Sequence, residues 1–181
     1  MLVLPQLTTG HVVRPALRSE LPALAAIRRE SWWATYRDLL PEAELRGMDD
    51  RRTAARMASV LGSPLQQLLV AVDGRGVVRG YAWVGPHREG MPGHHGEVYE
   101  LYLHPAAQGR GLGRQLLVEG IWWLVERGLH PVLVWVLAAN PARHFYAACG
   151  GERVARGPVK VAGRELQRLA YSWRGGLPLP G

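Results

Sequence analysis

The sequence is poor in several features that mark particular classes of protein. It contains a single cysteine, Cys149, so no disulfide can form within the chain, and a small secreted fold held together by disulfides is excluded. No uninterrupted apolar stretch is long enough to cross a bilayer. The first residues lack the basic start and apolar core of a signal peptide. These absences predict a cytoplasmic protein without a membrane partner.

Lysine is almost absent as well. The formal net charge is +7, and because Lys160 is the only lysine, nearly all of the positive charge is arginine. A compositional bias of the source proteome would produce this excess, and so would a field that attracts an anionic ligand. A nucleic-acid-binding protein would normally show a basic stretch interleaved with aromatic residues, and the sequence has none. We therefore expect no nucleic-acid partner.

The chain has the length and composition of one globular domain. Its 181 residues can bury a substantial core, and 48% of them are hydrophobic. We expect a single domain over residues 1–181, with a core from about residue 11 to residue 173 and a flexible tail over residues 174–181. His94 and His95 are adjacent, which does not match the spacing of metal ligands, so we expect no metal.

Apolar periodicity and turn residues predict the element order β-α-α-β-β-β-α-β-α-β-β. The predicted strands cover residues 12–16, 67–72, 77–84, 97–103, 132–137, 152–159 and 165–173. The predicted helices cover residues 21–40, 41–61, 111–127 and 141–149, and residues 85–96 are predicted to form a loop. Strand 97–103, helix 111–127 and strand 132–137 form a βαβ unit with parallel strands. The other strands should pair antiparallel, which gives a mixed α+β sheet.

A glycine-rich run, Gln108-Gly109-Arg110-Gly111-Leu112-Gly113, joins the first strand of this unit to its helix. Glycines at alternate positions let the backbone pass close to a ligand. The start of the following helix carries unpaired N–H groups and partial positive charge. The run therefore predicts a site for phosphate or pyrophosphate.

Two common phosphate-binding patterns do not fit this run. A Walker loop requires Gly-Lys-Ser/Thr, and the only lysine lies far downstream. The dinucleotide fingerprint requires a sixth-position glycine, where this chain has Arg114, and an acidic residue after the next strand, where it has Val136-Leu137-Ala138.

A third pattern, Gln/Arg-x-x-Gly-x-Gly/Ala, is matched by Gln108, Gly111 and Gly113. It resembles the pyrophosphate loop of the GCN5-related N-acetyltransferase (GNAT) family, which binds acetyl-coenzyme A.

Three further segments are similar to the same family. Residues 98–105 (VYELYLHP) resemble its central strand, residues 134–136 with 140–146 (NPARHFY) resemble its next strand and Asn…Phe-Tyr helix, and residues 31–41 resemble its acceptor-site helices. The resemblance spans residues 11–173 and implies the acyl-CoA N-acyltransferase fold, a mostly antiparallel sheet flanked by helices. The chain departs from the family in the spacing from Asn140 to Tyr146 and at Gly150-Gly151.

The resemblance implies roles for residues of this sequence, with acetyl-CoA as the acyl donor. Glu100 would be the general base, with Glu97 in reserve, and Tyr146 the acid that protonates the leaving thiolate. The alternative roles are structural: Glu100 would pair with an arginine, and Tyr146 would only pack against its neighbours. The implied cofactor-binding residues are Leu101 and Leu103 through their backbone, and Gln108, Gly109, Arg110, Gly111, Leu112, Gly113, Arg114, Asn140 and Arg143. The sequence also leaves open that Arg114 lies on a solvent-exposed helix face and that Asn140 caps the helix.

The implied activity is transfer of an acetyl group to a primary amine of a small molecule or peptide, by direct attack in a ternary complex. Trp32, Trp33, Tyr36 and Trp135 would line the acceptor pocket, although core packing would also explain each of them. A non-catalytic acyl-CoA-binding module and a protein N-terminal acetyltransferase are the alternative functions. The sequence leaves open whether the protein forms a homodimer.

Overall fold

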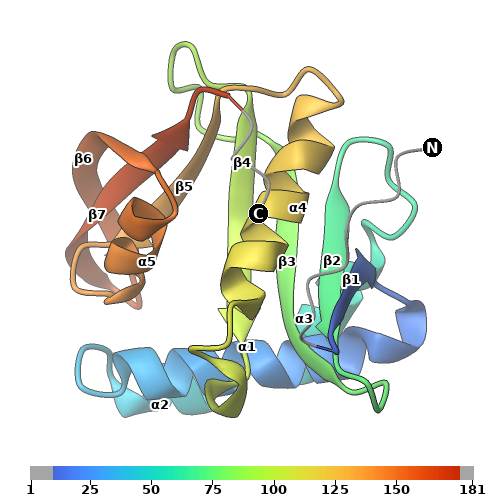
Figure 1. The fold of residues 1–181 in the computed structure, drawn as a ribbon. Coiled ribbons are helices and arrows are strands. Elements are labelled where there is room, and N and C mark those ends of the chain that lie inside the picture. Colours follow the sequence, from blue (N-terminus) through green and yellow to red (C-terminus); the bar gives the residue numbers. More distant parts are fainter. Residues whose placement is uncertain (1–9, 176–181) are drawn as a thin grey trace.

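The computed structural model describes residues 10–175, and its seven strands form one sheet in the order β1-β2-β3-β4-β5-β7-β6 (Figure 1). The strands are β1 (Val12–Pro15), β2 (Gln67–Val72), β3 (Val78–Pro86), β4 (Gly96–Leu103), β5 (Val132–Leu137), β6 (Glu152–Val161) and β7 (Arg164–Trp173). β4 and β5 pair in parallel and the other neighbours pair antiparallel. The predicted mixed sheet is confirmed. Residues 176–181 of the predicted tail lie outside the described residues.

Helices cover both faces of the sheet (Figure 1). They are α1 (Leu21–Tyr36), α2 (Glu42–Arg46), α3 (Asp50–Ala58), α4 (Leu112–Val125) and α5 (Ala142–Ala148). Side chains alternate along β3, so Tyr81 and Trp83 belong to the cluster beneath α1 and α3, whereas Ala82 and Val84 belong to the clusters beneath α4. The sheet is therefore buried on two sides, and its two faces carry separate side-chain sets.

The prediction of one helix over residues 41–61 was wrong. The chain turns at Gly47 and begins a new helix, α3, after Asp49, whose carboxylate accepts hydrogen bonds from the amides of Arg51 (2.8 Å) and Arg52 (3.1 Å). An aspartate side chain accepts hydrogen bonds from the free amides at a helix start, so Asp49 favours the start of a new helix at this position. Two other bounds also differ from the prediction. Helix α1 ends at Tyr36 rather than near residue 40, and the loop predicted over 85–96 is shortened by the ends of β3 and β4.

β4 and β5 separate along their length, and this separation positions the site. Their pairing is limited to residues 96–98 with residues 132–134. Beyond Val98, β4 continues to Leu103 with β3 as its partner, so alternate backbone groups on its other edge have no strand beside them. In Figure 1, the two ribbons diverge below this short paired stretch, and α4 lies against β4.

The turn between β2 and β3 predicts a pH dependence of stability. The Asp73 carboxylate accepts bonds from the Val77 amide (3.0 Å), the Arg79 Nε (2.8 Å) and the Arg75 amide (2.9 Å), and these lower its pKa to about 2. A carboxyl group with a lowered folded pKa stabilises the fold above its unfolded pKa, and this contribution is lost as pH falls toward about 2. Asp73→Asn should therefore destabilise the protein at neutral pH and progressively less in acid. Urea unfolding of both proteins across this range measures the difference; a constant difference would contradict the assignment.

Candidate active site

A cavity of about 830 Å³ opens where β4 and β5 separate. Five parts of the fold line it: the end of α1, residues 99–103 of β4, the glycine loop, residues 134–137 of β5, and α5 with the neighbouring β-hairpin. It is thus bounded on one side by the predicted phosphate loop and on another by aromatic side chains. The cavity is large enough for a small-molecule ligand.

Most predicted cofactor-binding residues meet in this cavity. Those that line it are Leu101, Leu103, Gln108, Gly109, Gly111, Gly113, Arg114 and Asn140. Three others do not: Arg110 is exposed, Leu112 is buried in the core, and the Arg143 Nη1 donates to the carbonyl of Ala138 at 2.8 Å. The structure therefore brings the loop glycines together with the splayed part of β4.

The glycine loop has a backbone that other residues rarely adopt. Gly109 and Gly111 have φ angles of +74° and +81°, in the left-handed region. A Cβ built on Gly111 would meet no atom within 4 Å, so the space above the loop is open. Gly111 is also the N-cap of the 14-residue helix α4, whose first amides have no partner within the helix. This combination suits a pyrophosphate group.

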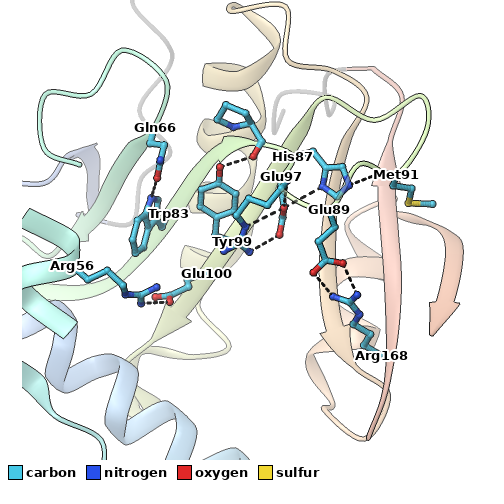
Figure 2. A network of polar contacts seen from close by, with 12 residues as sticks. Arg56, Gln66, Trp83, His87, Glu89, Met91, Glu97, Tyr99, Glu100 and Arg168 are labelled. Atoms are coloured by element: carbon cyan, nitrogen blue, oxygen red, sulfur yellow. Dashed lines mark hydrogen bonds and ion pairs between the residues drawn. The ribbon is translucent and has the colours of Figure 1, made fainter. Parts of the chain in front are cut away.

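Glu100 lines the cavity and is held by three groups, of which Figure 2 shows Arg56. Its Oε1 accepts from the Arg56 Nη2 at 2.6 Å and its Oε2 from the Tyr81 hydroxyl at 2.6 Å, while the Arg28 Nε lies 3.4 Å from Oε1. Its side chain is only 9% exposed. The predicted pairing with arginine is therefore present, and Glu100 is nevertheless one of the residues that line the cavity. Its partners belong to α1, α3 and β3, which no local sequence signal connects to β4.

Glu97, the reserve candidate for the base, does not line the cavity. It is 2% exposed and accepts a bond from the Arg88 Nη2 at 2.7 Å, while the His87 Nδ1 lies 3.2 Å from its carboxylate (Figure 2). The His87 Nε2 accepts from the amide of Met91 at 2.9 Å, so the Nδ1 carries the proton. These contacts fasten the segment between β3 and β4.

Tyr146 is buried at the cavity wall, with 5% of its surface exposed. Its ring contacts Phe145, Tyr171 and Trp173 at centroid distances of 5.2, 6.3 and 6.2 Å. Burial raises the pKa of Tyr146 far above its ordinary value, and the nearby Tyr36 raises it further. The phenol is therefore protonated at neutral pH and can donate a proton or a hydrogen bond.

Asn140 connects α5 to α1. Its Nδ2 donates to the Tyr36 hydroxyl at 2.6 Å, and its Oδ1 accepts from the amide of Ala142 at 2.8 Å. The helix-start role considered for this residue is thus present. Burial raises the pKa of Tyr36, so this hydroxyl also stays neutral.

Of the aromatic residues expected around the acceptor, Trp32, Tyr36 and Trp135 line the cavity and Trp33 does not. Trp33 packs in the cluster between α1 and α2. Its neighbour Trp32 lines the cavity and donates from Nε1 to the Tyr102 hydroxyl at 2.7 Å. Trp32 is four residues before Tyr36, so the two rings share one face of α1, with centroids 5.0 Å apart.

Two absences hold for the part of the chain that the structure describes. Within residues 10–175, no group of three or more His, Cys, Asp or Glu side chains is arranged to hold a metal ion. No helix in that range is both long and apolar enough to span a membrane.

Known proteins resemble this chain in sequence and in fold. The model of the acetyltransferase (GNAT) family matches residues 26–150. An uncharacterized N-acetyltransferase of Bacillus subtilis, YuaI, is 33% identical over 161 residues, which are 89% of this chain and 91% of that protein. A mycothiol acetyltransferase of Arthrobacter is 38% identical over 131 residues, which are 68% of this chain and only 39% of that protein.

A solved structure supports the same assignment. It is that of yncA, a putative acetyltransferase from Salmonella typhimurium with its cofactor acetyl-CoA. It aligns with a TM-score of 0.71 and 26% identity, covering 92% of this chain and 94% of that one. Because the family model covers more than half of the chain and YuaI matches along nearly all of it, the chain belongs to the GNAT acetyltransferase family.

Proposed function

We propose that this protein transfers the acetyl group of acetyl-CoA to the primary amine of a small molecule, by direct attack in a ternary complex. One observation carries the proposal: a single cavity joins the glycine loop to Glu100 and Tyr146. A base, an acid and an anion-binding loop that border one space can act on two ligands held side by side.

The residues around the loop fit the acyl donor. The amides from Gly109 to Arg114 would donate to its pyrophosphate, with the Arg114 guanidinium adding charge. The backbone of Leu101 and Leu103, which has no strand beside it, would pair with the extended arm of the donor as it would with a neighbouring strand. The Leu103 carbonyl is already occupied by the Ser31 hydroxyl at 2.9 Å, so this residue would contribute its amide. Acetyl-CoA supplies the activated thioester carbonyl.

The proposed proton transfers use two side chains. The Glu100 carboxylate would accept the proton of the attacking amine through a water molecule, and Arg56 and Tyr81 hold it in place. The Tyr146 hydroxyl would donate a proton to the leaving thiolate. A thiol with a free pKa of about 8.5 leaves as a weakly basic thiolate, and the Tyr146 phenol, kept neutral by burial, carries the proton that it would receive.

The cavity lining supports a small acceptor over a polypeptide terminus. An N-terminal acetyltransferase would be expected to offer an open, acidic groove. Here the lining contains one carboxylate, Glu100, which is paired with arginines, and several aromatic rings: Trp32, Tyr36, Tyr99, Tyr102 and Trp135. A non-catalytic acyl-CoA-binding module would have no need for both Glu100 and Tyr146 at the cavity.

Initial-velocity kinetics test the ternary complex. Rates measured over a grid of acetyl-CoA and amine concentrations should give intersecting double-reciprocal lines, because both ligands bind before any bond breaks. Parallel lines, together with an acetylated enzyme detected by mass spectrometry in the absence of amine, would instead indicate a covalent intermediate.

Tyr146→Phe tests the proposed acid. Loss of the hydroxyl should lower kcat by about 10- to 100-fold, because proton donation contributes on the order of 10²-fold, and should leave the Kd for coenzyme A unchanged. Tyr171→Phe is the matched control, since its ring contacts Tyr146 but does not line the cavity. An equal fall in kcat for both variants would indicate a packing role for Tyr146.

A further inference from the structure

Arg168 is a functional candidate that the sequence did not reveal. It lies on β7 opposite Leu137 of β5, and its guanidinium carbon lies 4.0 Å from the centroid of the Trp135 ring. Both side chains line the cavity. Of the described arginines that form ion pairs with carboxylates, Arg168 is the one that borders this space. It is therefore the cation best placed to meet an acceptor molecule.

Arg168 already holds a carboxylate. Its Nη1 and Nη2 donate to the Oε1 and Oε2 of Glu89 at 2.7 and 2.5 Å, a bidentate contact (Figure 2). This geometry is specific to a planar carboxylate or a similar anion. The hydrogen bond from Arg168 is the main cause of the lowered pKa of Glu89, so Glu89 is ionised at neutral pH.

Glu89 is a removable partner. Its side chain is 45% exposed and it belongs to the segment between β3 and β4, next to Gly90, whose φ is +67°. That segment is fastened at a different point, by the contacts of Glu97 with His87 and Arg88. The contact between Glu89 and Arg168 can therefore open without loss of the loop's own anchor.

Two further donors beside this contact are unused. The Nε of Arg168 and the Nε1 of Trp135 are buried, and neither has a hydrogen-bond partner among the described residues. An unpaired buried donor is costly, so this pair of side chains has more donor capacity than Glu89 satisfies. Both atoms are shielded in this arrangement, so a ligand would reach them only after Arg168 moves.

We propose that the acceptor is an amine that also carries a carboxylate, of the amino-acid class, and that its carboxylate replaces Glu89 on Arg168. The proposal rests on the proposed N-acetyltransferase function. The acceptor would be oriented by its carboxylate at Arg168 and Trp135, with its amine toward Glu100 in the same cavity. Glu89 would compete with the acceptor for the guanidinium.

Matched acceptors test this assignment. The probes are the standard amino acids and short ω-amino acids. Each is compared as an acceptor with its own carboxamide, at a saturating concentration of acetyl-CoA. We expect kcat/KM for the preferred carboxylate to exceed that of its carboxamide by at least about tenfold. Arg168→Gln should remove most of this preference, by lowering the carboxylate rate and leaving the carboxamide rate nearly unchanged.

Variants of Glu89 give an effect of opposite sign. Glu89→Ala should lower KM for carboxylate acceptors, because it removes the internal competitor. Glu165→Ala, which changes an exposed glutamate on the same strand as Arg168, should leave KM unchanged. Arg168→Lys retains the charge but not the bidentate geometry, and serves if Arg168→Gln does not fold, as judged by thermal unfolding.

Several outcomes would overturn the proposal. These are equal rates for carboxylates and carboxamides, an equal loss of both rates in Arg168→Gln, or a raised KM in Glu89→Ala. Amines that lack a carboxylate and turn over as fast as or faster than every carboxylate acceptor would retain the acetyltransferase function and reject only this acceptor class. If no amine is acetylated, the same carboxylate and carboxamide pairs are titrated by calorimetry into the coenzyme A-saturated protein. Binding of a carboxylate that is lost in Arg168→Gln would support the carboxylate site at Arg168. Equal binding of the carboxylate and its carboxamide would reject that site.

Discussion

Replacement of Gly111 by valine is expected to weaken coenzyme A binding by at least about 100-fold while the protein remains folded. Gly111 has a φ of +81°, which costs a residue with a Cβ on the order of 1–2 kcal/mol. A valine would relieve this strain by turning the loop, and the free amides at the start of α4 would then point elsewhere. Its side chain would also enter the open space above the loop. Calorimetric titration with coenzyme A measures the loss.

A second glycine controls for backbone strain. Gly128 follows the other end of α4, has a φ of +71°, and likewise has no atom within 4 Å of a built Cβ. Gly128→Val should therefore lower the thermal stability by a similar amount and leave the Kd for coenzyme A unchanged. Retained affinity in Gly111→Val, or equal losses of affinity in both variants, would contradict the pyrophosphate assignment.

Glu100→Gln is expected to lower kcat by on the order of 10²-fold or more, since a general base contributes about 10²- to 10⁴-fold. The amide keeps the shape of the side chain but cannot accept the proton of the amine. The Kd for coenzyme A should be nearly unchanged, because the loop lies on another wall of the cavity.

Arg56→Gln separates a base from a structural carboxylate. Arg56 donates to Glu100 at 2.6 Å, is about half exposed, and does not line the cavity. If Glu100 only holds its arginine partners, removing either member of the pair should have similar effects. If Glu100 is the base, Arg56→Gln should change kcat by only a fewfold, with any cost seen in thermal stability. Similar kcat values for both variants would count against the catalytic role.

The fold was predictable where its signals are local. Glycines at alternate positions between an apolar strand and an amphipathic helix identified the βαβ unit, because that spacing has few structural uses. The break between α2 and α3 was also encoded locally, by Gly47 followed by Asp49, but the apolar residues on either side suggested one continuous helix. Capping chemistry prevailed over periodicity there.

The site was predictable only in part, because its side chains are brought together by tertiary contacts. Glu100 was identifiable as a carboxylate in an apolar strand, but the arginines that hold it come from α1 and α3. Arg168 reaches the cavity because β7 pairs with β5, a neighbour that no sequence spacing specifies. Trp32 and Trp33 were both expected at the acceptor pocket and only Trp32 lines the cavity, since the sequence alone does not fix how α1 is rotated against the sheet.

The most direct test of the account is acetyl transfer itself. Purified protein is incubated with acetyl-CoA and an amine panel, while thiol release is followed and the amines are analysed by mass spectrometry. We predict amine-dependent thiol release matched mole for mole by an N-acetylated product, and loss of both in Gly111→Val. Tight binding of acetyl-CoA with no acetylated product from any amine would contradict the enzymatic account and indicate a protein that only binds acyl-CoA.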